Sequence, residues 1–293
     1  MPRKLSSLTS DSLSALGLVA RLLAAPGRNR ADLCYAFLGT RNCPSTDCTY
    51  LNFGYWRCAT DYCAAAEALV DLLGDAAGIA EGDVVVDVGC GFGDQDVRLA
   101  RTRRPHCIHA VNVSELQLTH ARLHNADPRI VYRNCSATRL PFADGSIDKV
   151  VSLEAAFHFD TRESFLREAF RVLKPAGRIA VLDLVALEQE GKAHTGGLHG
   201  WLDRWRWQVP SANAYGMTEY GRILQSIGFV DCTLRSVRED VIPGFSAFMR
   251  GLLADPAAMQ RFHPVVRHGM RHSGDPFANT DYLLVTAAKP HGH

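Results

Sequence analysis

A glycine-rich segment that follows a run of valines constrains the fold more than any other part of the chain. Residues 84–88 form a short run of mostly β-branched residues, which is typical of a buried parallel strand. Glycine then occupies every second position, at Gly89, Gly91 and Gly93, and this spacing predicts a tight turn that lets the backbone approach a ligand. The acidic stretch 94–96 suits the first turn of a helix. This order predicts a nucleotide-type site in a doubly wound α/β sheet.

The carboxylate just before the first glycine narrows the choice of ligand. A loop built for a pyrophosphate would gain nothing from Asp87, whereas a ligand with a positive ammonium group would. The glycines also depart from the dinucleotide pattern, which would place its third glycine where Asp94 stands. The loop therefore favours a cationic ligand over a dinucleotide.

Residues 87–93 resemble the D-x-G-x-G-x-G signature of class I S-adenosylmethionine-dependent methyltransferases. The resemblance implies a Rossmann-like, seven-stranded, mostly parallel sheet with helices on both faces and an antiparallel last strand. It implies S-adenosyl-L-methionine as the cofactor and no metal. In this family Asp87 and Gly89 would hold the methionine end of the cofactor, while Gly91 and Gly93 would allow its close approach.

Charge and hydropathy argue against two other classes of partner. The chain has 293 residues and a net charge of +1, so no overall field attracts nucleic acid or an anionic membrane. No apolar run reaches the ~18 residues of a spanning helix. The basic clusters at 101–104, Arg267 and Arg271 lack interleaved aromatic residues. We interpret them as solvated faces, and an RNA methyltransferase is the lesser alternative.

The nine cysteines are odd in number, and Cys90 lies within the glycine loop. Cys43 and Cys48, like Cys58 and Cys63, are spaced more widely than the common C-x2-C of metal pairs. Free, reduced cysteines are therefore expected, and they indicate a cytoplasmic location.

Strands and helices alternate between residues 84 and 184, which predicts a parallel sheet covered on both faces. Ser114 and Gln117 have the spacing of a capping box at a helix start. We expect an N-terminal helical cap at residues 1–60 and a methyltransferase domain at residues 61–293. Additions at about residues 185–215 and 240–278 would form a lid. The first addition contains four residues that could line an acceptor pocket, pack within the lid or form a dimer surface: His199, Trp201, Trp205 and Trp207.

Several cofactor contacts follow from the resemblance rather than from spacing alone. Asn112 stands where the family places an acidic residue on the ribose, and Val113 and Gln117 match the subgroup that methylates sugars, polyketides and other small metabolites. Gln117 is alternatively a solvated or capping residue. Ser136, followed by Ala137, stands where an aspartate usually contacts adenine.

Two further segments resemble the same subgroup. Tyr55 and Trp56 belong to a G-Y-W segment that closes over the cofactor, or they pack only within the cap. Glu154 and His158 follow the S-x-E-x-x-x-H pattern of small-molecule O-methyltransferases, and Glu154 is assigned to the cofactor site.

His158 is the candidate catalytic base, because an ordinary imidazole pKa near 6.5 suits proton removal. Phe157 and Phe159 flank it, so substrate positioning and simple packing are the alternatives. Asp183, near the end of a strand, is a second catalytic candidate that would orient His158 or hold a substrate group, unless it is an ordinary strand-end residue.

The resulting hypothesis is O-methylation of a small-molecule acceptor, most consistent with a secondary metabolite, by in-line displacement. C- or N-methylation shares every cofactor motif and is one alternative. The fold retained for binding or for a cyclisation is another. A homodimer is compatible with the sequence.

Overall fold

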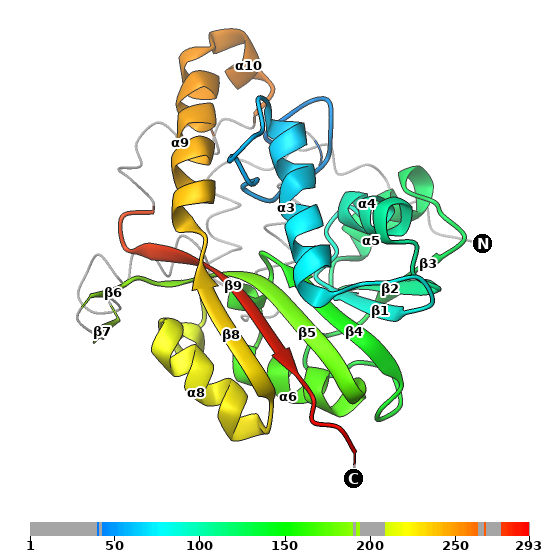
Figure 1. The fold of residues 1–293 in the computed structure, drawn as a ribbon. Coiled ribbons are helices and arrows are strands. Elements are labelled where there is room, and N and C mark those ends of the chain that lie inside the picture. The colour runs from blue at the N-terminus through cyan, green and yellow to red at the C-terminus, as the bar shows by residue number, and fades with distance from the viewer. Residues whose placement is uncertain are drawn as a thin grey trace, which may run out of the picture.

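A seven-stranded sheet with the order β3-β2-β1-β4-β5-β9-β8 forms the centre of the computed structural model (Figure 1). The structure describes residues 40, 43–189, 192–193, 209–262, 267 and 277–292. The strands are β1 (Val84–Val88), β2 (Cys107–Asn112), β3 (Ile130–Asn134), β4 (Ile147–Leu153), β5 (Leu173–Ala186), β8 (Val230–Ser236) and β9 (Thr280–Ala288). Two short strands, β6 (Glu188–Gln189) and β7 (Lys192–Ala193), pair separately.

The strand directions confirm the predicted Rossmann-like sheet. Strands β1 to β5 are parallel, and β9 is antiparallel to both of its neighbours, β5 and β8. Asp87 in β1 pairs with Ala110 on one side and Val151 on the other. The loops after β1, β2 and β4 therefore leave the sheet at one edge, where ligands bind in open α/β sheets.

Helices cover both faces of the sheet because neighbouring strand residues point to opposite sides. Val85 belongs to the core that includes α3, α4 and α9, whereas Val86 belongs to the core under α6 and α8 (Figure 1). The helices are α3 (Tyr62–Ala77), α4 (Asp94–Arg103), α5 (Glu115–His124), α6 (Arg162–Val172), α8 (Met217–Ile227), α9 (Arg238–Ala254) and α10 (Pro256–Gln260), with two short 3₁₀ turns, η2 (Ala156–His158) and η3 (Ser211–Asn213).

Helix ends agree with the sequence where capping decides them. The Ser114 side chain accepts from the Gln117 amide at the start of α5, and Gly228 ends α8 in a left-handed conformation. Helix α9 begins at Arg238 and contains Pro243. The sequence alone predicts a shorter apolar helix at residues 244–253, between Pro243 and Pro256. Packing of Val241 against the core outweighs the one backbone hydrogen bond that proline removes.

The prediction that all cysteines are free is wrong, because Cys48 and Cys63 form a disulfide. The chain before α3 folds back so that the two Cα atoms lie 6.1 Å apart. The other described cysteines, Cys43, Cys58, Cys90, Cys107, Cys135 and Cys232, are free. The cytoplasmic prediction thereby loses its main support.

Within the described ranges, no helix is long and apolar enough to cross a membrane. No group of His, Cys, Asp and Glu in those ranges is arranged to hold a metal ion. His199, the three tryptophans of the first predicted lid and most of the N-terminal cap lie outside the described residues.

Candidate active site

The glycine loop (residues 89–93) follows β1, and its three glycines have different neighbours. All three have positive φ: 92° at Gly89, 57° at Gly91 and 89° at Gly93. A Cβ on Gly89 would lie 2.3 Å from the Cβ of Ala155, and one on Gly93 would lie 2.5 Å from the hydroxyl of Tyr132. A Cβ on Gly91 would meet no atom within 4 Å. Packing within the protein therefore requires Gly89 and Gly93, whereas Gly91 borders space that a ligand can enter.

This difference predicts opposite outcomes for two alanine substitutions. Gly91→Ala should keep the fold at a cost of about 1–2 kcal/mol for the left-handed backbone, yet weaken binding of S-adenosylhomocysteine by about tenfold or more. Gly89→Ala should instead lower the thermal midpoint, because its Cβ overlaps Ala155. Calorimetric titration and thermal unfolding measure the two effects. Equal effects of both variants on ligand affinity at unchanged stability would contradict this assignment.

Asp87 lies beneath the glycine loop with no exposed surface. The side-chain amide of Gln95 donates to Asp87 Oδ2, and the carboxyl of Asp96 on α4 contacts the Asp87 carboxyl. Burial raises the pKa of Asp87 to about 6 and the pKa of Asp96 well above its ordinary value. Apart from contact between the two carboxyls, Asp87 Oδ1 and both Asp96 oxygens have no hydrogen-bond partner in the described ranges. Burial and the contact of two carboxyls favour one shared proton, and the negative charge that remains favours a cationic ligand at the loop.

The shared proton predicts a pH-dependent stability. Folded Asp96 keeps a proton that the unfolded chain releases above pH ~4, so the free energy of unfolding falls as pH rises, by about 1.4 kcal/mol per pH unit. Asp96→Asn removes this titration and should flatten the fall between pH 5 and pH 7. Urea denaturation across that range measures it, with exposed Asp160→Asn as the control. A slope identical to that of the wild type would show that Asp96 ionises normally.

The predicted ribose contacts form one buried cluster after β2, the ribose cluster, which consists of Asn112, Ser114 and Gln117. Asn112 Nδ2 donates to Gln117 Oε1 at 2.8 Å, and Asn112 Oδ1 accepts from the Ser114 amide at 3.2 Å. Gln117 Nε2 is buried and has no partner in the described ranges, so it is a free donor suited to a ligand hydroxyl. Val113, the residue after Asn112, is 37% exposed and offers an apolar surface.

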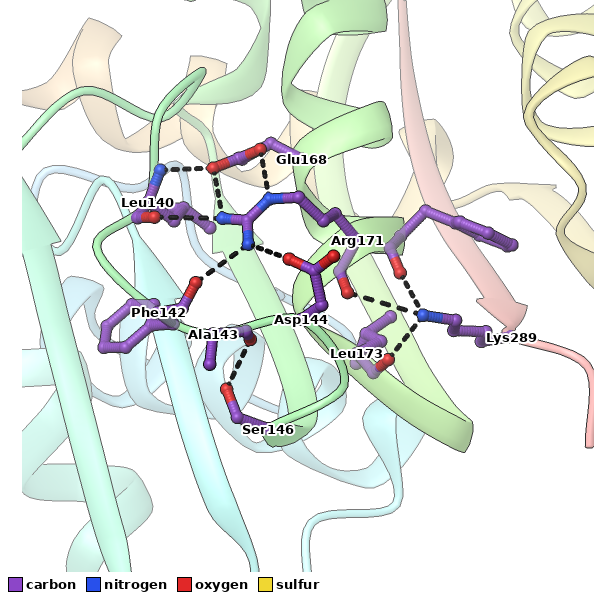
Figure 2. A network of polar contacts seen from close by, with 10 residues as sticks. Leu140, Phe142, Ala143, Asp144, Ser146, Glu168, Arg171, Leu173 and Lys289 are labelled. Carbon is purple, nitrogen blue, oxygen red and sulfur yellow. Dashed lines mark hydrogen bonds and ion pairs between the residues drawn. The ribbon is translucent and has the colours of Figure 1, made fainter. Parts of the chain in front are cut away.

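The predicted adenine contacts lie on the turn after β3, which α6 fixes. The hydroxyls of Ser136 and Thr138 are 3.0 Å apart, and Ala137 is buried. Figure 2 shows Arg171 reaching from α6 to the carbonyls of Leu140 and Phe142. The same guanidinium pairs with two acidic side chains, Glu168 and Asp144.

The aromatic segment (residues 50–56) is tied to several elements. Glu154 Oε1 accepts from the Phe53 amide at 2.8 Å and from the Tyr282 hydroxyl at 2.6 Å. Burial raises the pKa of Glu154 to about 8. These contacts of Glu154 anchor the segment over the end of β4, and the assignment of Glu154 to the cofactor stays a prediction.

Tyr55 and Trp56 connect the aromatic segment to α9. The Tyr55 hydroxyl donates to Asp240 Oδ2 at 3.0 Å, and the Trp56 amide donates to the Asp240 carbonyl at 2.8 Å. The Trp56 ring covers Gly244, where a Cβ would lie 2.2 Å from it, and contacts Phe248. Both side chains therefore have a packing role, and closure over a cofactor stays a prediction.

His158 ends the 3₁₀ turn η2, and the histidine turn (residues 155–159) packs against the glycine loop. The Gly89 Cβ position lies 2.3 Å from Ala155 and 3.7 Å from Phe159. His158 is half-buried, and its ring centroid is 3.9 Å from that of Phe157. The fold therefore brings the turn that carries the candidate base against the loop expected to hold the cofactor.

Asp183 is fully buried in β5 and contacts the histidine turn through its backbone. Its Oδ1 accepts from the Phe157 amide at 3.1 Å and from the Leu184 amide at 3.0 Å, while its Oδ2 pairs with Arg162 at 2.7 Å. Through these contacts Asp183 holds the turn, and its catalytic role stays a prediction. Its place near a strand end pointed to Asp183, whereas the sequence carried no signal for Arg162.

A strand, glycine loop, ribose cluster and histidine turn at one sheet edge define a class I methyltransferase. A model of the family "Methyltransferase domain" matches residues 86–181. The erythromycin 3''-O-methyltransferase of Saccharopolyspora erythraea is 31% identical over 287 residues, covering 89% of this chain and 90% of that protein. The chain therefore belongs to the class I S-adenosylmethionine-dependent methyltransferases, and S-adenosyl-L-methionine is its cofactor.

Solved structures show the same fold. The cyclase SpnF is 22% identical with a TM-score of 0.71, covering 92% of this chain and 98% of that one. The geranyl diphosphate C-methyltransferase of Streptomyces coelicolor A3(2), solved with S-adenosyl-L-homocysteine, is 18% identical with a TM-score of 0.68, covering 91% and 99%. At these identities the likeness concerns the fold alone.

Proposed function

We propose that the protein methylates a hydroxyl oxygen of a small organic acceptor, most consistent with a secondary metabolite, and that His158 is the base. The observation that carries this proposal is the packing of the histidine turn on the glycine loop, through Ala155 and Gly89. The name of the similar erythromycin 3''-O-methyltransferase supports oxygen as the methylated atom.

The chemistry assigns separate tasks to the residues at this edge. The cofactor supplies a methyl group on a sulfonium, which is already a good leaving group. The protein must then align the acceptor and remove its proton, and His158 would accept that proton. Gln117 would donate to a ribose hydroxyl of the cofactor, and Val113 would cover its adenine ring. The charge of the Asp87 and Asp96 pair would favour the cationic end.

The proposal also assigns roles to the domain and to the two additions. Residues 61–293 would form the catalytic domain, and the additions at 185–215 and 240–278 would cover the acceptor. Helices α9 and α10 belong to the second addition, and α9 already contacts the aromatic segment through Asp240. A homodimer and a cytoplasmic location stay predictions.

Methyl-labelled S-adenosylmethionine, offered with a panel of hydroxylated macrolides and deoxysugar glycosides, tests the reaction. Mass spectrometry and NMR of the products should show label on oxygen. Label on carbon or nitrogen would favour the C- or N-methylation alternative, and acceptor conversion without label would favour a cyclisation. A parallel incubation with total RNA, followed by nucleoside digestion, should remain unlabelled.

A further inference from the structure

We propose that Asn213 is a positioning residue for methyl transfer, whose side-chain amide holds the backbone on both sides of His158. Asn213 lies in η3, far from the turn in sequence, and is 2% exposed. Its position matches no motif in the chain. The inference rests on the proposed role of His158 as the base.

The amide nitrogen of Asn213 bonds to the turn that carries His158. Nδ2 donates to the Phe157 carbonyl at 3.2 Å and to the Phe159 carbonyl at 2.9 Å. These carbonyls belong to the residues immediately before and after His158. One planar group thus uses both of its donor hydrogens to fix the peptide units that orient the imidazole.

The oxygen end of Asn213 is anchored to helix α6. Oδ1 accepts from the Arg162 amide at 2.7 Å, at the first residue of that helix. The backbone carbonyl of Asn213 accepts from Arg162 Nη1 at 3.0 Å. Asn213 is therefore held at both its side chain and its backbone, and it cannot follow the turn if the turn moves.

The same buried network holds both N–H and C=O groups of the histidine turn. Asp183 accepts from the Phe157 amide, and Arg162 pairs with Asp183. Asn213 donates to the carbonyls of Phe157 and Phe159, which belong to later peptide groups of the same turn. Removing the amide donors of Asn213 would leave the hydrogen bond from the Phe157 amide to Asp183, and the turn would be free to shift. A misplacement of about 1 Å at a reacting group can cost about 10²-fold in rate.

Asn213→Asp separates the two ends of the amide. The carboxylate keeps an oxygen for the Arg162 amide and nearly the same volume, but it has no donors for the two carbonyls. We expect kcat to fall by about 10- to 100-fold. The dissociation constant of S-adenosylhomocysteine, measured by calorimetry, should change by less than threefold, because Gly91 and Gln117 are untouched. Ser211→Ala, on the exposed face of the same turn, should leave both values unchanged.

A double-mutant cycle with His158→Ala distinguishes positioning from general damage. If Asn213 acts through His158, Asn213→Asp should have no further effect on kcat in the His158→Ala background. The inference is overturned if kcat falls by the same factor in both backgrounds, if it stays at the wild-type value, or if ligand affinity falls in parallel with it. Asn213→Ser, which also lacks the amide, is measured in the same way if Asn213→Asp does not fold by circular dichroism.

Failure of the proposed function is recognised separately. A wild-type rate for His158→Ala alone would remove the base, and with it the positioning of that base by Asn213. Loss of activity in His158→Ala with equal effects of Asn213→Asp in both backgrounds would overturn the positioning role only.

Discussion

The His158→Ala variant is expected to lose about 10²–10⁴-fold in kcat, the range that a positioned general base contributes. The reason is that a hydroxyl acceptor must lose its proton as the methyl group arrives, and alanine has no atom to accept it. Binding of S-adenosylhomocysteine should stay within about threefold of wild type, because the glycine loop and the cluster after β2, rather than the imidazole, are expected to hold the cofactor. Initial rates at saturating acceptor and calorimetry measure the two quantities.

Two control variants give this prediction its contrast. His106→Ala changes an exposed histidine before β2 and should leave kcat unchanged. His158→Gln keeps a polar side chain that cannot act as a base at neutral pH, so it should be nearly as slow as His158→Ala. A fast His158→Gln would assign His158 to substrate positioning. Wild-type rates in both variants would assign it to packing, which is also what C- or N-methylation by proximity alone would allow.

The Arg162→Leu variant is expected to lose about 3–5 kcal/mol of unfolding free energy, the usual cost of breaking a buried ion pair from one side. Arg162 and Asp183 are both 0% exposed and 2.7 Å apart. Leucine would leave Asp183 buried without its cation, and it would remove the donors to the carbonyls of Leu184 and Asn213. Urea denaturation measures the loss. Arg167→Leu on the exposed face of the same helix breaks only a surface pair with Glu163, worth about 0.3–0.5 kcal/mol.

The loss in Arg162→Leu should also depend on pH. Burial raises the pKa of Asp183, and Arg162 opposes that rise. Without the guanidinium the folded-state pKa rises further, so the variant keeps a proton that the unfolded chain releases above pH ~4. Its stability therefore falls as pH rises, and the deficit should be smaller at pH 5 than at pH 8. A deficit independent of pH would mean that the variant loses packing rather than charge compensation.

Much of the fold was predictable because its signals are local. The valines of β1, the left-handed glycines after it and the cap at Ser114 depend on neighbours in sequence, and the structure confirms each of them. Helix α9 was misjudged because Pro243 signals a boundary locally, while packing of the helix against the sheet decides otherwise. The disulfide was missed because Cys48 and Cys63 meet only when the segment before α3 folds back.

The candidate site divides in the same way. The motifs located Asp87 and Asn112 at strand ends, and Gln117 and His158 a few residues after strands. Parallel pairing brings these strand ends to one edge of the sheet. The motifs do not report what lies behind each residue. The buried carboxyl of Asp87 contacts that of Asp96, and Glu154 accepts a hydrogen bond from the Phe53 amide. These partners come from other elements, so the motifs could not identify them.

Periodicity and glycine spacing thus determined the class of fold, and the resemblance of the motifs implied the cofactor, since each signal depends on residues close together in the chain. The tertiary structure alone decided which buried polar groups pair. Arg162 with Asp183 and Asn213 with the histidine turn join segments tens of residues apart. Such pairings follow from desolvation, which requires each buried polar group to find whatever partner the packed elements bring beside it.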